Sequence, residues 1–479
     1  MFMEMIHRYA QNSTALSMLS GISKLRMDTK GGPLSRLPLE IFDRHMALWG
    51  TTGAGKSNVF EVLLKRFLPL VFKGEMSCIV VESSVLPDRI ARYVDVVLGK
   101  ADDPRIIWLD LQPDEDGGYD HLIEMNLFEI PKCYKGRVST EKLSGLYSNI
   151  CETLFNQPLS QHMKNVLNAS INLMLSVGDP SVPLLVEILS DPGKFLDDPD
   201  VDIDDSTRSF IEDEIIGGSV AYKRQIADVR ARIHSLTMTA LTRRLFCSNE
   251  PTINLVDEVN KGAFLVAALR SGESSDDTAS LIGRILVNIG KQISQSRRSA
   301  KGKRCVTIID EVHNFFVKED FPDLRSIHKE SRKDRFGCCS GLQQPGDMGS
   351  DLFDTFMNCS GIQMAGKMKT RAAAKKIADD MGLSPEQIMD LVTGEFWLKV
   401  SDHYETAIKI TVPPGSLGVW RTDAQREAMQ EQARKSSEKM RRIMARRYSS
   451  AITKTARKAK ARQRIKRGTF HPQIVRKAS

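Results

Sequence analysis

Long apolar runs are missing from this sequence. No segment approaches the roughly 18 apolar residues that a membrane-spanning helix needs. The N-terminal residues lack the charged-then-apolar pattern of a secretory signal, since polar residues interrupt it at His7, Arg8 and Asn12. Apolar residues still make up 41% of the 479 residues, which is enough for a globular core and excludes a disordered protein. We therefore expect about two or three folding units in the cytoplasm, or at the inner membrane through a partner.

Patterned metal ligands and disulfide frameworks are also missing. The eight cysteines contain no C-x-x-C pair and the nine histidines show no ligand spacing, so we expect scattered core thiols in a reducing compartment. The acidic stretch 198–205 does not fit a calcium loop. Starting the loop at Asp200 places Asp205 where glycine is required and Ile211 where the bidentate glutamate belongs. We interpret this stretch as a solvated acidic loop.

Acidic residues are almost missing from the C-terminal segment. From Arg434 to Ser479 the chain has 17 Lys and Arg and one acid, Glu438, a net charge of +16; because the whole chain carries +8, the remainder carries −8. A tail of this kind is typical of binding to a polyanion, and its binding weakens with salt because counterions are released. The segment has two aromatic residues, Tyr448 and Phe470, so base stacking is not indicated. DNA is the partner that we favour; anionic lipid, an acidic protein patch and no specific partner remain alternatives.

What the sequence does contain is a complete phosphate-binding motif. Residues 50–57 fill every fixed position of G-x-x-x-x-G-K-[ST], an apolar run at 46–49 predicts a strand before them, and helical spacing over 58–68 predicts a helix after them. Strand, glycine loop and helix together surround phosphates with backbone N–H groups and the positive end of the helix. We expect Lys56 to reach the β- and γ-phosphates and the Ser57 hydroxyl to hold Mg²⁺. The predicted nucleotide-binding residues are Gly50, Thr51, Thr52, Gly53, Ala54, Gly55, Lys56 and Ser57.

A second motif indicates that the bound nucleotide is hydrolysed. Val306-Thr307-Ile308-Ile309 is a continuous apolar run, typical of a strand buried on both faces of a parallel sheet, and it ends in Asp310 and Glu311. We expect Asp310 to hold Mg²⁺ through its water shell and Glu311 to polarise the attacking water. The two motifs together predict an ATP hydrolase that uses ATP and Mg²⁺.

The order of the predicted elements indicates an α/β fold. Strands alternate with helices over 36–135 and again over 256–415, which predicts a parallel sheet with helices on its faces. Residues 136–255 show helical periodicity instead, so we expect an all-helical insertion, with helices at 140–154, 161–176 and 220–245. Residues 1–35 are expected to form a helical or irregular arm, and 416–479 a basic helical or disordered tail. Ser384-Pro385-Glu386-Gln387 is a capping box that predicts a helix start. The predicted strands are 46–49, 78–82, 105–110, 263–268, 306–310, 337–342, 361–365 and 396–400.

These features together resemble the HerA/FtsK superfamily of translocating ATPases, particularly the TraD/TraG/TraC-like ATPases of type IV secretion and conjugation. The stretch 44–57, the place of the helical insertion and Ile309-Asp310-Glu311-Val312-His313 are similar to the corresponding parts of that family. Downstream, residues 331–337 and then Leu342-Gln343-Gln344-Pro345 resemble its R-K-x-G … T-Q-x-P stretch, with Gln343 at the position of the polar sensor for the γ-phosphate or the water. The resemblance covers about residues 36–415. It departs from the family at Leu342, where threonine is usual, and at Glu82-Ser83-Ser84, where relatives commonly have aspartate and a glycine-containing turn.

The resemblance implies a RecA-like P-loop sheet that assembles as a ring, expected to be a homo-hexamer, with ATP between neighbours. An arginine from the next subunit commonly stabilises the γ-phosphate, and Arg332 and Arg335 are the candidates, with Arg371 third, although a solvated helix face explains the first two equally well. The implied function is a motor that translocates or pumps DNA, without sequence preference, in conjugation, type IV secretion or packaging. One alternative is a secretion ATPase that energises assembly or protein transport without DNA in its pore. The other is a non-motor nucleotide switch, against which the paired Asp310 and Glu311 argue.

Overall fold

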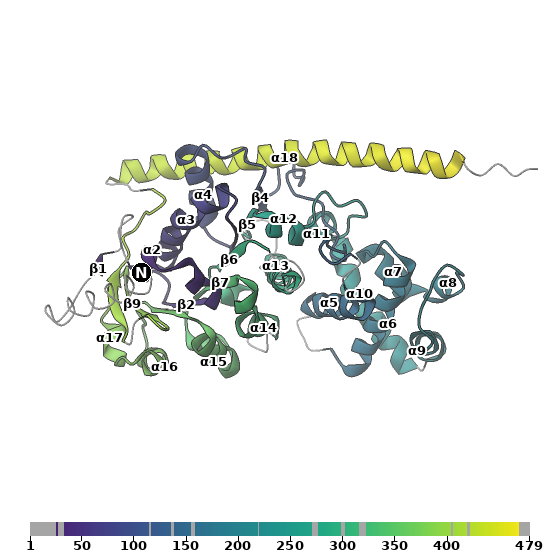
Figure 1. The fold of residues 1–479 in the computed structure, drawn as a ribbon, viewed down its shortest axis with the longest axis horizontal. Coiled ribbons are helices and arrows are strands. Elements are labelled where there is room, and N and C mark those ends of the chain that lie inside the picture. The colour runs from purple at the N-terminus through teal and green to yellow at the C-terminus, as the bar shows by residue number, and fades with distance from the viewer. Residues whose placement is uncertain are drawn as a thin grey trace, which may run out of the picture.

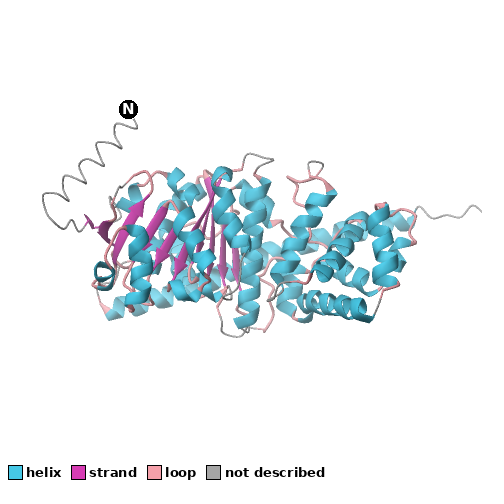
Figure 2. Cartoon of the chain, turned by 90° about the horizontal axis from the view of Figure 1, so that it is seen from below, coloured by secondary structure: helices cyan, strands magenta, loops and turns pink. Residues whose placement is uncertain are grey.

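A single mixed sheet forms the centre of the molecule in this computed structural model (Figures 1 and 2). The structure describes residues 25–26, 33–114, 116–135, 138–154, 159–218, 220–270, 276–297, 302–315, 322–403, 406–418 and 422–468. Within them the sheet has ten strands in the order β1-β10-β9-β8-β2-β7-β6-β3-β5-β4. The strands are β1 (Leu25–Arg26), β2 (Met46–Trp49), β3 (Met76–Glu82), β4 (Ile106–Asp110), β5 (Phe264–Ala268), β6 (Arg304–Ile309), β7 (Phe336–Leu342), β8 (Ile362–Ala365), β9 (Glu395–Val400) and β10 (Ile408–Thr411).

The predicted parallel sheet is confirmed in its central part. From β8 to β4 all neighbouring strands are parallel, and each strand predicted from the sequence is present with both ends within two residues of the prediction. The sheet becomes antiparallel at β9, which pairs with both β8 and β10. The short strand β10 escaped prediction because it is mostly half-buried near the sheet edge and lacks the continuous apolar run of the central strands.

Helices cover both faces of the sheet (Figures 1 and 2). The helices α3 (Lys56–Phe72) and α4 (Leu86–Arg92) lie on one face, and α13 (Asp276–Ser296), α14 (Pro322–Glu330) and α15 (Ser350–Cys359) lie on the other, as right-handed crossovers between these strands require. Four further helices join them: α2 (Pro33–Arg36), α12 (Leu255–Lys261), α16 (Arg371–Met381) and α17 (Pro385–Met389). The predicted capping box is present at the start of α17, where Ser384 is the N-cap.

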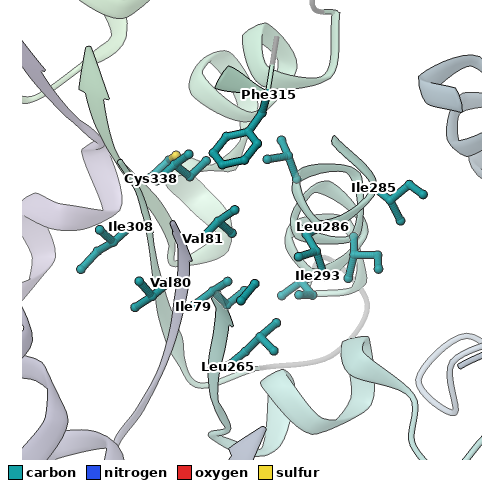
Figure 3. Packing of buried hydrophobic residues seen from close by; sticks show 14 of the residues in the cluster. Ile79, Val80, Val81, Leu265, Ile285, Leu286, Ile293, Ile308, Phe315 and Cys338 are labelled. Carbon is teal, nitrogen blue, oxygen red and sulfur yellow. The ribbon is translucent and has the colours of Figure 1, made fainter. Parts of the chain in front are cut away.

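The core between the sheet and α13 explains why the central strands are apolar throughout. Every residue of β3 is buried, and its alternate side chains serve opposite faces: Ile79 and Val81 face α13, whereas Val80 points to the other side (Figure 3). Leu286 and Ile293 of α13 complete this layer. Such burial on both faces fixes the strand positions, and with them the loops at the strand ends.

A helical unit lies between β4 and α12, at one end of the sheet (Figure 1). Its elements are α5 (Thr140–Leu154), α6 (Gln161–Val177), α7 (Val182–Ser190), α8 (Gly193–Leu196), α9 (Asp205–Phe210), the π-helix η3 (Ile211–Ile216), α10 (Val220–Met238) and α11 (Ala240–Phe246). The sequence predicts one helix over 220–245; the structure has two, because the Thr239 hydroxyl accepts a bond from the Thr242 N–H (3.1 Å) and starts a new helix there. The domain boundaries drawn from the sequence remain predictions.

No single helix in the described part of the chain is long and apolar enough to cross a bilayer. Only α6 and α7 together reach the required length and composition, and they are bent by 117° relative to each other. Their apolar side chains, such as Val166, Leu173 and Leu185, are buried among the other helices of this unit. Packing inside the insertion therefore accounts for their composition.

Segments near both ends of the chain contact the sheet or the helices on it. Leu25 and Arg26 form β1 beside β10, so the prediction of a helical or irregular arm is wrong at these two residues; an edge strand offers unpaired backbone groups to such a segment. At the other end, α18 (Asp423–Gly468) runs as one long helix across α4 and the edge strand β4 (Figure 1). Met440, Met444 and Tyr448 are buried on this contact. The first part of the basic tail is thus docked on the core.

Candidate active site

Three strands deliver the predicted functional residues to one edge of the sheet, and a fourth, β3, lies beside them. β2, β7, β6 and β3 are adjacent and parallel, with Trp49 paired to Leu342 and Val81 paired to Ile309. Their carboxyl ends therefore lie side by side. The phosphate-binding loop leaves β2 at this edge, Gln343 leaves β7, and the Asp310-Glu311 pair leaves β6.

The phosphate-binding loop has the backbone conformation that its glycines permit. Gly53 and Gly55 have φ values of +84° and +100°, in the left-handed region that disfavours a side chain. A Cβ added to Gly55 would lie 3.3 Å from the Gly394 nitrogen. The loop ends at Lys56, the first residue of α3, so the N–H groups of the first helical turn face the loop. This is the predicted strand, loop and helix.

Neighbouring loops hold the phosphate-binding loop from outside. The Thr51 N–H and hydroxyl both donate to the Lys367 carbonyl at 3.1 Å, just beyond β8. On the other side, the Thr393 hydroxyl donates to the Gly53 carbonyl (3.1 Å), and the Gly394 N–H donates to the Ala54 carbonyl (3.0 Å). The first two bonds use donors of the loop, and the last two satisfy carbonyls of the loop, so the loop is held on both sides by its neighbours.

Lys56 and Ser57 lie where the motif predicts. The Lys56 ammonium is buried and donates to the Gly50 carbonyl at 2.8 Å, so the side chain folds over the loop. Burial lowers the pKa of Lys56, and the nearby carboxylates of Asp310 and Glu311 oppose this shift. The Ser57 hydroxyl donates to Asp310 Oδ2 at 2.9 Å. The two predicted magnesium ligands are therefore in contact.

The chemistry of this donor set fits a magnesium ion. Asp310 is 2% exposed, and burial raises its pKa, with Lys56 and Ser57 acting in the opposite direction. A hydroxyl and a carboxylate are the hard oxygen donors that Mg²⁺ accepts, and a divalent cation would stabilise the buried charge. Space beside Asp310 is limited by β7, because a Cβ on Gly341 would lie 2.5 Å from Asp310 Oδ1. Glycine at this position lets the carboxylate face Ser57.

Glu311 and Gln343 are in direct contact. Gln343 Nε2 donates to Glu311 Oε1 at 3.2 Å, and this contact is possible because β7 lies between the strands of the two motifs. Glu311 has a φ of +53°, a left-handed conformation that is unusual for a non-glycine residue and recurs at functional sites. The predicted water-polarising acid is therefore joined to the predicted sensor.

Two further residues belong to this edge and were not predicted as part of the site. Glu82 ends β3 next to β6 and is 1% exposed; burial and the neighbouring Asp310 raise its pKa to about 7, although the Ser84 N–H donates to its carboxylate. The sequence signal that could have identified Glu82 is an apolar run that ends in an acid, the same pattern that identified Asp310 after β6. Asn314 follows β6 and donates to Glu311 Oε2 at 3.0 Å. No sequence pattern distinguishes it.

The structure places the three candidate arginines differently. Arg332 and Arg335 lie at the amino end of β7, the opposite edge from Gln343, and both are exposed. Seven residues of β7 span about 20 Å, so neither reaches the site of its own chain. Arg371 begins α16, beyond β8, and forms an ion pair with Glu386. An action of Arg332 or Arg335 on a neighbouring subunit remains a prediction.

Comparisons with known proteins agree with this geometry. The family model for the helicase HerA central domain matches residues 27–81. Among solved structures, the plasmid coupling protein TrwB in complex with ADP and Mg²⁺ is similar with a TM-score of 0.55 at 14% identity, over 82% of this chain and 89% of that one. VirB4 of Thermoanaerobacter pseudethanolicus is similar with a TM-score of 0.52 at 15% identity, over 83% and 98%. No curated protein matches the sequence.

The resemblance inferred from the sequence is confirmed at the level of the fold. The chain has the RecA-like P-loop fold that the coupling protein and VirB4 share, over more than four fifths of its length. Sequence identities near 15% support a common fold, but they do not establish the roles of individual residues. The roles of the site residues therefore rest on the geometry described above.

Proposed function

We propose that this protein is an ATP-hydrolysing motor subunit that translocates or pumps DNA in conjugation, type IV secretion or packaging. The observation that carries the proposal is the meeting of Lys56, Ser57, Asp310, Glu311 and Gln343 at one sheet edge, within a fold similar to a plasmid coupling protein. This set contains a phosphate-binding loop, a magnesium site and a water-polarising acid. A nucleotide switch, whose slow hydrolysis only sets its state, has less need of such an acid.

Each residue has a defined task in hydrolysis. The loop N–H groups and Lys56 hold the β- and γ-phosphates, and Ser57 and Asp310 hold Mg²⁺, which supplies positive charge to the phosphate oxygens when bound. Glu311 orients and polarises the water. Gln343, in contact with Glu311 at 3.2 Å, brings a second polar group to the same place.

The assembly that we propose is a homo-hexameric ring with the nucleotide between neighbours. Arg332 and Arg335 support it, since they are exposed and too far from their own site, and an arginine acting in trans must face the next subunit. Mixing two inactive variants tests this. Lys56→Ala keeps the arginines but lacks the phosphate ligand, and the Arg332→Ala, Arg335→Ala double variant keeps the site. Equal mixtures should regain part of the wild-type rate; no gain above either variant alone would exclude action in trans.

DNA is the substrate that we propose, and the basic tail is its first contact. The docked part of α18, up to Tyr448, contributes side chains to the core, whereas residues 449–479 carry ten Lys and Arg and no acid. A chain ending at Ser450 therefore removes this charge and keeps the buried residues Met440, Met444 and Tyr448. A cut near Gln432 would also remove Met440 and Met444 from the core.

The deciding experiment measures ATP hydrolysis with and without double-stranded DNA, at two salt concentrations, on the full chain and on the chain ending at Ser450. Stimulation that survives the truncation means that the ring itself grips DNA. Stimulation lost with the tail makes the tail the recruiting element, and loss of stimulation at high salt indicates that the contacts are made to phosphates. Hydrolysis without any stimulation would overturn the DNA motor and favour a secretion ATPase that moves protein or drives assembly.

A further inference from the structure

The Glu311 side chain is held by more than the residue predicted to act with it. Glu311 Oε1 accepts a bond from Gln343 Nε2 (3.2 Å), and Glu311 Oε2 accepts one from Asn314 Nδ2 (3.0 Å). A carboxylate with one donor on each oxygen is restrained about its terminal torsion, which is otherwise broad. The direction of the carboxylate is therefore set from two sides.

Asn314 also fixes the backbone of Glu311. Residues Val312–Asn314 form a 3₁₀ turn, η4, in which the Asn314 N–H donates to the Glu311 carbonyl at 2.8 Å. This turn accompanies the left-handed conformation of Glu311, with φ +53°. The main chain and the side chain of Asn314 thus both bind Glu311. A donor from outside the η4 turn could hold the Glu311 carboxylate but not its backbone.

The Asn314 amide is itself tied to a third strand. Asn314 Nδ2 donates to the Ser83 hydroxyl at 3.2 Å as well as to Glu311. Ser83 follows Glu82 at the end of β3, which is paired with β6 over its whole length up to Ile309. The amide therefore bridges the turn after β3 and the acid after β6, two segments whose separation is fixed by strand pairing.

The turn that carries Asn314 is anchored in the core. Phe315 is 1% exposed and points between the sheet and α13 (Figure 3). Gly283 of α13 makes room for it, since a Cβ there would lie 2.4 Å from Phe315 Cδ1. The Ser280 hydroxyl donates to the Phe315 carbonyl at 3.4 Å. The base of η4 is packed against α13, and this packing places the amide of Asn314.

We infer that Asn314 is the positioning residue for Glu311: its amide, supported by Ser83, holds the carboxylate toward the water while Gln343 is free to exchange partners. The inference rests on the proposed function. The hydrogen bonds of the Asn314 amide go to Ser83 and Glu311, whereas Gln343 directly follows β7, the strand that pairs with β2. The side-chain amides of Asn314 and Gln343 both hold Glu311. We assign the positioning role to Asn314 because its turn, η4, is anchored both to α13 and to Ser83 at the end of β3.

The test is a comparison of steady-state ATP hydrolysis by full-length variants. Asn314→Ala should lower kcat roughly 10- to 100-fold, the range for one hydrogen bond to a charged group, while KM for ATP stays within about twofold. The isosteric Asn314→Asp should be at least as slow, because it removes the donor and repels Glu311. Ser83→Ala should show a smaller loss in the same direction. The matched control is Asn249→Ala, an exposed asparagine outside the site, which should be unchanged.

A double variant separates positioning from a general structural effect. If Asn314 acts only through Glu311, adding Asn314→Ala to Glu311→Gln costs no further rate, whereas independent effects would multiply. A wild-type kcat for Asn314→Ala, or multiplying losses in the double variant, would overturn the inference. Failure of the proposed function looks different, since Glu311→Gln itself would then hydrolyse ATP at the wild-type rate.

Discussion

Replacing Glu82 by glutamine should change how the stability of this protein depends on pH. The carboxyl is 1% exposed and lies beside Asp310, and these surroundings raise its pKa from 4.5 to about 7. Glutamine has nearly the same shape and keeps an acceptor for the Ser84 N–H, but it cannot ionise. The variant therefore isolates the cost of the Glu82 charge.

The sign and size of the effect follow from the shift. Because the folded-state pKa lies above the unfolded one, the stabilising contribution of Glu82 is fully present below pH 4.5 and is lost as pH rises through about 7. Each pKa unit is worth about 1.4 kcal/mol, so ionising Glu82 in the folded protein costs about 3 kcal/mol. Glu82→Gln should accordingly gain about 3 kcal/mol relative to wild type between pH 4.5 and pH 8.

Thermal unfolding without Mg²⁺ or nucleotide measures this gain, because a bound cation would favour the ionised form. At about 2 cal/mol/K per residue, 3 kcal/mol corresponds to about 3 °C for a chain of 479 residues that melts as one unit. The difference between variant and wild type must be followed, since His328 acts in the opposite sense: burial lowers its pKa to about 4, so its contribution is lost as pH falls from 6.5. A difference that stays constant from pH 5 to pH 8 would refute the reasoning.

Four further predictions follow from the site and the tail. Lys56→Ala should abolish nucleotide binding or turnover, measured by titration with a fluorescent ATP analogue; unchanged affinity and rate would remove Lys56 from the site. Glu311→Gln should retain ATP and stabilise any ring, detectable as a larger species in gel filtration with ATP; turnover at the wild-type rate would contradict its role. Gly341→Ala should destabilise the fold by about 1–3 kcal/mol and lower kcat more than tenfold, because its Cβ would lie 2.5 Å from Asp310 Oδ1; a silent substitution would show that the Asp310 position is not critical. Met440→Ala should cost about 2–5 kcal/mol and expose α18 to limited proteolysis, whereas an equally protected helix would show that the buried Met440 does not hold it.

Short stretches of the chain are enough to specify the local chemistry of the site. The phosphate-binding loop is continuous in the chain, and its glycines allow the φ values of +84° and +100° that the loop adopts. The apolar runs were long enough to predict each central strand within two residues. Strands that are buried on both faces consist of such apolar runs, so the central strands can be predicted from the local pattern of apolar residues.

Some tertiary facts left no such trace. The strands β1 and β10 lie at one edge of the sheet. β1 has only two residues, and β10 has four that are mostly half-buried, so neither has a continuous apolar run. The docking of α18 rests on separate contacts such as the Lys439–Asp95 ion pair (2.6 Å) and the bond from Arg447 to the Ile106 carbonyl (2.7 Å). From the sequence, Lys439 and Arg447 could be recognised only as members of a basic tail, because their partners Asp95 and Ile106 lie far away in the chain.

The composition of the active site was decided by strand order. Ser57 and Asp310 are 253 positions apart and meet at 2.9 Å because β7 and β6 follow β2 in the sheet; the same order brings Gln343 and Asn314 to Glu311 and places Glu82 beside Asp310. Arg332 and Arg335 precede β7, so the direction of this strand places them at the opposite edge. The periodicity of apolar residues shows how each segment is buried. Which strands pair depends on packing across the whole core, so the order of the strands could be known only from the folded chain.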